Sequence, residues 1–149
     1  MTLAISGHGA LVQRAPVSAP QTFTTIAEVG DIQAPGLMRN EFEALTQDKN
    51  IDAYILGVLR RQPMTLSLNF LPSDGTQDHL TGLQYACITE PPPVEGYKII
   101  GPSGSGFLWI FSGQVKEVAN VKFPVDGKAA ADVTIRPSGK MYIGAVLIG

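Results

Sequence analysis

Alternating apolar and polar positions predict that the chain is built largely of short strands. The clearest alternation covers residues 64–71, where Leu66, Leu68 and Phe70 lie between small polar residues. Residues 37–46 alternate in the same way, with apolar side chains on one side and charged ones on the other. A period of two indicates strands with one buried and one exposed face. We expect these two strands to pair as a hairpin whose polar face consists of Arg39, Glu41, Glu43, Thr65, Ser67 and Asn69.

Other apolar segments extend this pattern along the chain. Residues 23–32 are rich in β-branched side chains and predict a strand interrupted near Gly30. Glycine-rich turns separate further predicted strands at residues 97–100, 107–111, 114–123, 131–136 and 141–148. Short strands at regular spacing are typical of a β-sandwich or a partly closed barrel.

Two segments have helical spacing instead. The apolar positions Ile51, Tyr54, Ile55, Val58 and Leu59 predict a short helix that ends before Pro63. A second helix is expected over residues 76–86, with Asp74 and Gln77 as a capping pair. We expect Leu80, Leu83 and Cys87 to form its buried stripe. Leu80 and Leu83 would cover one end of a core made of Trp109, Phe111, Leu66, Leu68 and Phe70.

The first 21 residues have no clear period, contain several turn-forming residues and carry Arg14 as their only charged side chain. They predict an extended arm, residues 1–21, that becomes ordered by packing on a partner. Residues 22–149 are then the β domain, and a chain of 149 residues is the length of one domain.

The composition limits the classes of function. Charged residues make up 16% of the chain, against about 25% in typical proteins, and the net charge is −2. A basic nucleic-acid surface and a disordered chain are therefore not expected. No apolar run reaches the ~18 residues that a membrane helix needs. So few charges suggest that part of the surface is buried against partners.

No residue constellation predicts catalysis, a metal site or a cofactor. The glycine-rich residues 101–106 lack the lysine and the following helix of a phosphate-binding loop, so a hairpin turn is expected. His79 is next to Asp78 without a nucleophile, and Cys87 is on the apolar side of its predicted helix. The aromatic strand with Phe107, Trp109 and Phe111 leaves one alternative open, a monomeric module that binds carbohydrate or another ligand.

Several ordered segments give the chain a resemblance to the major tail tube proteins of long, flexible-tailed bacteriophages. These are residues 23–32 with Pro35, Gly36 and Leu37, then residues 64–72 with the helix that follows, and then residues 107–113 and 125–140. The opening residues 4–9, with Leu11, Gln13 and Arg14, fit as well.

The resemblance implies a non-enzymatic virion protein, made in the bacterial cytoplasm, with a β-sandwich, one flanking helix, a long hairpin and an N-terminal arm. Its subunits would form stacked rings, usually hexamers, around a channel for double-stranded DNA that is not bound specifically. Expected partners are further copies, the tape measure protein, the tail terminator and distal tail proteins, with no membrane. A tube protein of a bacterial secretion or contractile apparatus is a second alternative.

Within that resemblance, two sets of residues have expected positions. The polar strand face of Arg39, Glu41, Glu43, Thr65, Ser67 and Asn69 would line the channel. The arm would contact a neighbouring subunit or ring through Ile5, His8, Leu11 and Arg14.

Overall fold

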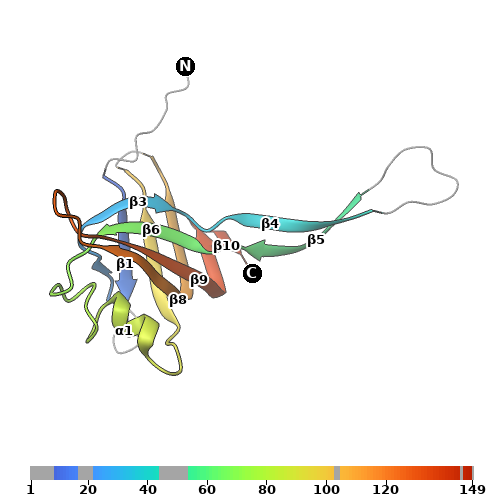
Figure 1. The fold of residues 1–149 in the computed structure, drawn as a ribbon. Helices are drawn as coiled ribbons and strands as arrows, with labels where there is room; N and C mark the ends of the chain where they lie inside the picture. Colours follow the sequence, from blue (N-terminus) through green and yellow to red (C-terminus); the bar gives the residue numbers. More distant parts are fainter. Residues whose placement is uncertain (1–8, 17–21, 44–53, 103–104, 145, 149) are drawn as a thin grey trace, which may run out of the picture.

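The computed structural model describes residues 9–16, 22–43, 54–102, 105–144 and 146–148, and it is mainly antiparallel β-structure with one short helix (Figure 1). One sheet holds eight strands in the order β2-β1-β7-β8-β9-β6-β3, with β10 paired to β9. A separate two-stranded ribbon, β4–β5, extends from the domain. The strands are β1 (Leu11–Ala15), β2 (Thr24–Thr25), β3 (Val29–Gln33), β4 (Leu37–Glu43), β5 (Tyr54–Arg61), β6 (Met64–Asn69), β7 (Glu95–Ile100), β8 (Leu108–Lys122), β9 (Ala130–Ile143) and β10 (Val146–Ile148).

The large sheet curls over its own inner face without closing into a barrel. Its outermost strands, β2 and β3, are joined by only residues 26–28, so the two ends of the sheet lie close together. The Ile26 amide donates to the Val12 carbonyl, and the Asn69 amide donates to the Glu28 carbonyl. These bonds tie the connection to both ends of the sheet.

The inner face of the curled sheet forms the core. Leu66, Leu68 and Phe70 are buried as their alternation predicts, and Phe111 is buried as well. The Phe111 ring stacks on Tyr97 at 5.7 Å between centroids. Trp109 is only half-buried at the edge of this cluster, where it stacks on the exposed Phe107.

Strand lengths in the second half differ from expectation. The segments 107–111 and 114–123 are one strand, β8, whose register shifts at three places let a 15-residue strand bend across the sheet. Its partner β9 continues to Ile143, and β10 folds back on residues 141–143. The apolar C-terminal segment therefore pairs with its own sheet.

The predicted helix at residues 51–59 is wrong. Tyr54–Arg61 is strand β5, paired along its length with β4. The predicted pairing of residues 37–46 with residues 64–71 is also wrong, since β6 lies between β3 and β9. Gly57 and the β-branched Ile55 and Val58 disfavour a helix, and the cross-strand partner decides in favour of a strand.

The second predicted helix is shorter and later than expected. It is α1 (Leu83–Ile88), and turns precede it. The Asp74 carboxylate accepts from Thr76 instead of capping this helix. Gln77 is buried, and its side chain bonds to Leu71, Ala27 and Asn69 across the loop. Leu83 is buried as predicted, whereas Leu80 is 66% exposed.

The N-terminal segment is not wholly an arm. Residues 11–15 are strand β1, inserted between β2 and β7, with Val12 and Arg14 buried. The absence of a visible period has a physical cause, because the inward position at Arg14 is occupied by a charge. The proposed boundary at residue 21 lies outside the described residues.

Candidate assembly surfaces

The β4–β5 ribbon is anchored at its base and projects from the domain (Figure 1). The Gln62 amide donates to the Gly36 carbonyl where the two strands leave the sheet. Arg61 donates to the carbonyl of Gly139 on β9. Beyond this base, the described ribbon residues are paired only with each other.

Both faces of the ribbon carry exposed apolar side chains. Phe42 lies opposite Ile55, and they are 57% and 59% exposed. The neighbouring pair places Glu41 opposite Leu56, which is 64% exposed on the other face. A two-stranded ribbon with apolar atoms on both faces is marginally stable in water, so it gains stability when a partner covers each face.

Gly57 shapes one of these faces. A Cβ atom at Gly57 would lie 2.8 Å from Cε2 of Phe42, so the absence of a side chain lets the Phe42 ring cover the backbone there. Arg39 also donates to the Gly57 carbonyl, at 2.9 Å. The exposed Phe42 ring therefore packs at a defined position on the ribbon, over Gly57.

The six predicted channel residues fall on two separate surfaces. Thr65, Ser67 and Asn69 lie on the outer face of the large sheet, opposite the buried side chains of β6. Arg39, Glu41 and Glu43 are exposed on the ribbon, opposite Leu59, Leu56 and Tyr54. Because β4 does not pair with β6, the structure does not form the single polar face that the alternation predicted.

The outer sheet face around β6 is polar and carries the carboxylates of Glu28, Asp31 and Asp132, with Lys128 in the same cavity as Glu28. Ser67 pairs with Asp132 of β9, and its hydroxyl accepts from the Asp31 amide. Asn69 donates to the Glu28 carboxylate at 3.1 Å. Among the described residues the one ion pair is Arg14–Glu95, so no ion pair neutralises the carboxylates on this face. An open cavity of about 220 Å³ lies between Asp31, Ser67 and Asp132.

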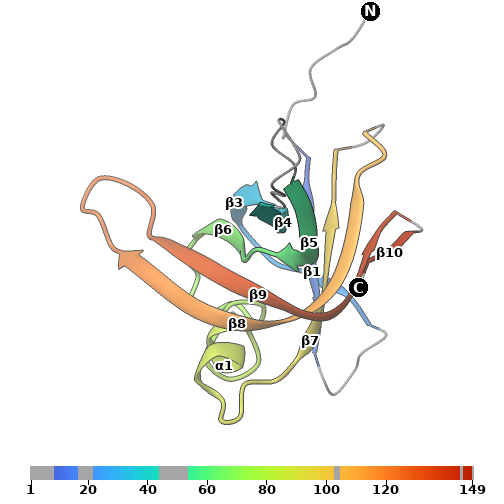
Figure 2. The ribbon, with the colours of Figure 1, turned by 90° about the vertical axis from the view of Figure 1, so that its right-hand side faces the viewer.

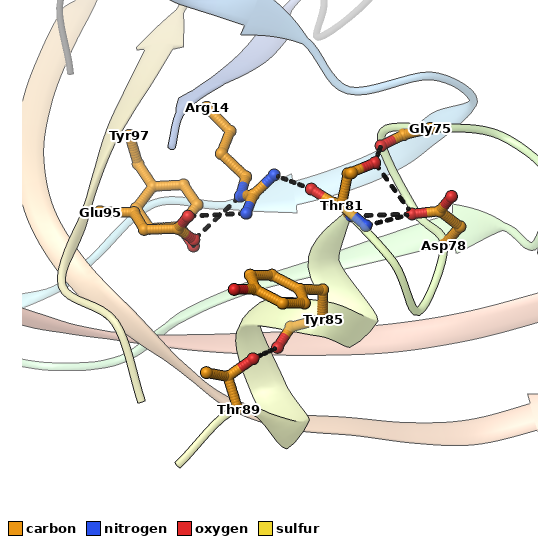
Figure 3. A network of polar contacts seen from close by, with 9 residues as sticks. Arg14, Gly75, Asp78, Thr81, Tyr85, Thr89, Glu95 and Tyr97 are labelled. Atoms are coloured by element: carbon orange, nitrogen blue, oxygen red, sulfur yellow. Dashed lines mark hydrogen bonds and ion pairs between the residues drawn. The ribbon is translucent and has the colours of Figure 1, made fainter. Parts of the chain in front are cut away.

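A buried polar network ties β1 to β7 and to the loop before α1 (Figure 3). Arg14 donates to both Glu95 carboxylate oxygens and to the Thr81 carbonyl. The Asp78 carboxylate accepts from the amides of Thr81 and Gly82, which holds the loop before α1.

The hydrogen bonds from Thr81 and Gly82 lower the pKa of Asp78, and hydrogen bonds from Thr76 lower the pKa of Asp74. Burial, with the Glu95 charge beside it, raises the pKa of Tyr97.

The four predicted arm residues are divided as well. Ile5 and His8 lie outside the described residues. Leu11 begins β1 and is 41% exposed. Arg14 is buried within its own chain and bonded there to Glu95, so its role as an arm contact is corrected to an internal one.

The remaining candidate residues do not form a site for chemistry. His79 is exposed, and Cys87 packs half-buried against the core. Phe107 and Trp109 stack on each other at 5.3 Å, while Phe111 is inside, so the three rings do not form a flat platform.

Among the described residues, no three His, Cys, Asp or Glu side chains are grouped to hold a metal ion. No helix of the described segments is long and apolar enough to cross a membrane.

Comparison with known proteins finds likeness in structure alone. No protein-family model matches the sequence, and no curated protein matches it. A chain of the anti-feeding prophage baseplate, six-fold symmetrised, matches with a TM-score of 0.71 and 10% identity over 97% of this chain and 99% of that one. A chain from the tail of an empty gene transfer agent particle, refined with C6 symmetry, gives 0.70 and 13% over 94% and 98%. A chain of the PVC extracellular contractile injection system, in its sheath–tube complex, gives 0.70 and 11% over 98% and 95%.

These likenesses establish that nearly the whole chain has the fold found in those chains of tail and injection particles. Sequence reasoning expected a long hairpin but paired residues 37–46 with residues 64–71, so it did not find that β4 and β5 form the projecting ribbon. It also missed the Arg14–Glu95 pair. The ribbon could have been inferred from the dense apolar residues on both sides of residues 44–53, read as two strands. No local signal links Arg14 to Glu95, since 81 positions separate them.

Proposed function

We propose that the chain is a structural subunit of a phage-type tail tube, which assembles with copies of itself into stacked rings within a virion. The observation that carries this proposal is the β4–β5 ribbon, whose apolar residues are exposed on both faces. A ribbon of this kind fits between two neighbouring bodies, one against each face. Repetition of that contact produces a closed ring or a stack of rings.

The structural likenesses support this role. They cover nearly the full length of this chain and of the matched chains, and two of the matched structures have six-fold symmetry. We therefore expect a hexameric ring. A tape measure protein, a tail terminator and distal tail proteins are the further partners that such a tube would have.

The outer sheet face around β6 is the surface that we propose to line the channel. It carries Thr65, Ser67 and Asn69 among the carboxylates of Glu28, Asp31 and Asp132, which outnumber the one lysine beside them, Lys128. DNA has about one negative charge per 1.7 Å of its axis, so an acidic and hydroxyl-rich wall does not retain it. Ring symmetry would repeat each carboxylate around the bore and strengthen this field.

A tube protein of a contractile injection system is the second candidate, since one matched structure is the sheath–tube complex of such a system. The two candidates share the subunit contacts and differ in what passes through the channel.

Electron microscopy and sedimentation of the purified full chain test the proposal. We expect rings or tubes at high protein concentration. A species of 15.9 kDa at every concentration tested, with or without added carbohydrate, would contradict it and would favour the ligand-binding alternative.

A further inference from the structure

A second apolar surface lies beside α1, away from the ribbon. An open cavity of about 430 Å³ is lined by Leu80, Tyr85 and Pro93, with the Arg14–Glu95 pair among its lining residues. We call this cavity the α1 groove. Leu80 is 66% exposed, and Ile88, three residues after Tyr85 and therefore on the same helix face, is 64% exposed. A cluster of exposed apolar side chains around a cavity marks an interaction site.

The segment that forms the groove carries negative charge only. Residues 70–93 contain Asp74, Asp78 and Glu90, which belong to the elements around the groove and not to its lining, and have no lysine or arginine. The one arginine of the groove, Arg14, is neutralised by Glu95. A partner with basic and apolar side chains therefore complements this surface.

Residues 121–128, the end of β8 and most of the loop that joins it to β9, are apolar and mainly basic, and we call them the β8–β9 tip. Phe123 is 70% exposed although its ring contacts Phe70 edge-on, and Val125 is 99% exposed. Lys122 and Lys128, both exposed, flank these two side chains, and the exposed Asp126 lies between the lysines, so two lysines and one aspartate give the tip a net charge of +1. The tip extends from the body of the domain (Figure 2).

We propose that the β8–β9 tip of one copy docks in the α1 groove of a second copy. This contact rests on the proposed self-assembly and names one of its interfaces. The ribbon fits the groove less well, because the outer part of its described strands carries Glu41 and Glu43, whereas its arginines lie nearer the base. Tip and groove are different surfaces of one chain, so the contact is head-to-tail and repeats from copy to copy.

Cysteine cross-linking tests which segment occupies the groove. In a Cys87→Ser background, one protein carries Val125→Cys and a second carries Leu80→Cys. We expect the mixture, oxidised under assembly conditions, to give a disulfide-linked heterodimer. The control is a separate mixture of Val58→Cys with Leu80→Cys, which places the cysteine on the ribbon instead of the tip. We expect little disulfide-linked heterodimer from this control.

Charge reversal tests the complementarity. We expect Lys122→Glu/Lys128→Glu to raise the protein concentration needed for assembly about tenfold, and Glu90→Lys in that background to recover most of the loss. Lys116→Glu changes an exposed lysine of β8 outside the tip, and we expect a change of less than about twofold.

The outcomes separate this contact from the proposed function. If the Cys87→Ser protein assembles and the Val125→Cys mixture gives no cross-link, or if the Val58→Cys mixture reacts in its place, the tip contact is overturned and self-assembly stands. Normal assembly of the double glutamate variant also overturns it. A wild-type protein that remains monomeric overturns both.

Discussion

Arg14 and Glu95 meet inside the domain in a two-point ion pair, with Nε–Oε1 at 2.9 Å and Nη2–Oε2 at 2.6 Å. Their side chains are 7% and 2% exposed. The pair joins β1 to β7, and a third bond from Arg14 holds the Thr81 carbonyl. It therefore fixes the N-terminal strand and the loop before α1 in one arrangement.

Removing one member of this pair should destabilise the protein strongly. Glu95→Gln leaves the buried Arg14 charge without its counter-ion, and we expect a loss of about 3–5 kcal/mol in the free energy of unfolding, measured with urea. The double variant Arg14→Met/Glu95→Leu removes both charges. Its loss of unfolding free energy should therefore be smaller than the sum of the losses of Arg14→Met and of Glu95→Leu. Single losses below about 1 kcal/mol would show that the pair is not needed.

Alkaline pH should destabilise the protein through Tyr97. The raised pKa keeps Tyr97 protonated in the folded state, whereas in the unfolded chain it ionises near its ordinary value of 10.0. The unfolded state then binds fewer protons, so the free energy of unfolding falls as the pH rises above about 10. Urea titrations at about pH 9 and about pH 11 should show a smaller fall for Tyr97→Phe than for the wild type. Equal falls would assign the effect to other groups.

Alanine substitutions at Phe70 and Leu80 should distinguish a core side chain from a surface side chain. Phe70 is 8% exposed, so Phe70→Ala should cost about 3–5 kcal/mol in urea unfolding. Leu80, which the helical pattern assigned to the core, is 66% exposed, and Leu80→Ala should change stability by less than about 0.5 kcal/mol. Similar losses at both sites would restore the longer helix that the sequence pattern predicted.

The ribbon should be needed for assembly and not for folding. Ile55→Asp and Leu56→Asp place a charge on opposite faces of the ribbon, and each should abolish ring formation in sedimentation experiments. Unfolding free energies should stay within about 0.5 kcal/mol of the wild type, because both side chains are exposed. Ile55→Val is the matched control. If only one aspartate variant fails to assemble, the ribbon is covered on one face instead of two.

The outer face around β6 should control passage of DNA without affecting assembly. Thr65→Lys/Ser67→Lys adds two positive charges per subunit, which we expect to slow DNA delivery by particles that carry the variant tube. Thr65→Asn/Ser67→Asn is the neutral control and should deliver DNA normally. Normal delivery by the lysine variant would place this face outside the channel.

The local pattern was sufficient for most of the strands. Residues 64–71 alternate so regularly that β6 and its buried face follow from the sequence, because a period of two has one structural solution when one face is apolar. The mainly β class followed from the same pattern. The predicted core residues Leu66, Leu68, Phe70 and Phe111 are confirmed as buried for this reason.

Pairing and long-range contacts were decided only by tertiary structure. Residues 54–61 have apolar positions that satisfy a helical and an extended period alike, and the ladder with β4 resolves the ambiguity. The same ladder separates Glu41 from Ser67, which the alternation had placed on one face. Arg14 looked like part of an extended arm that packs on a partner, because its counter-ion lies 81 positions later in the chain. Local sequence determines which face of a strand is apolar, whereas the identity of its neighbours depends on contacts between segments that are far apart in sequence.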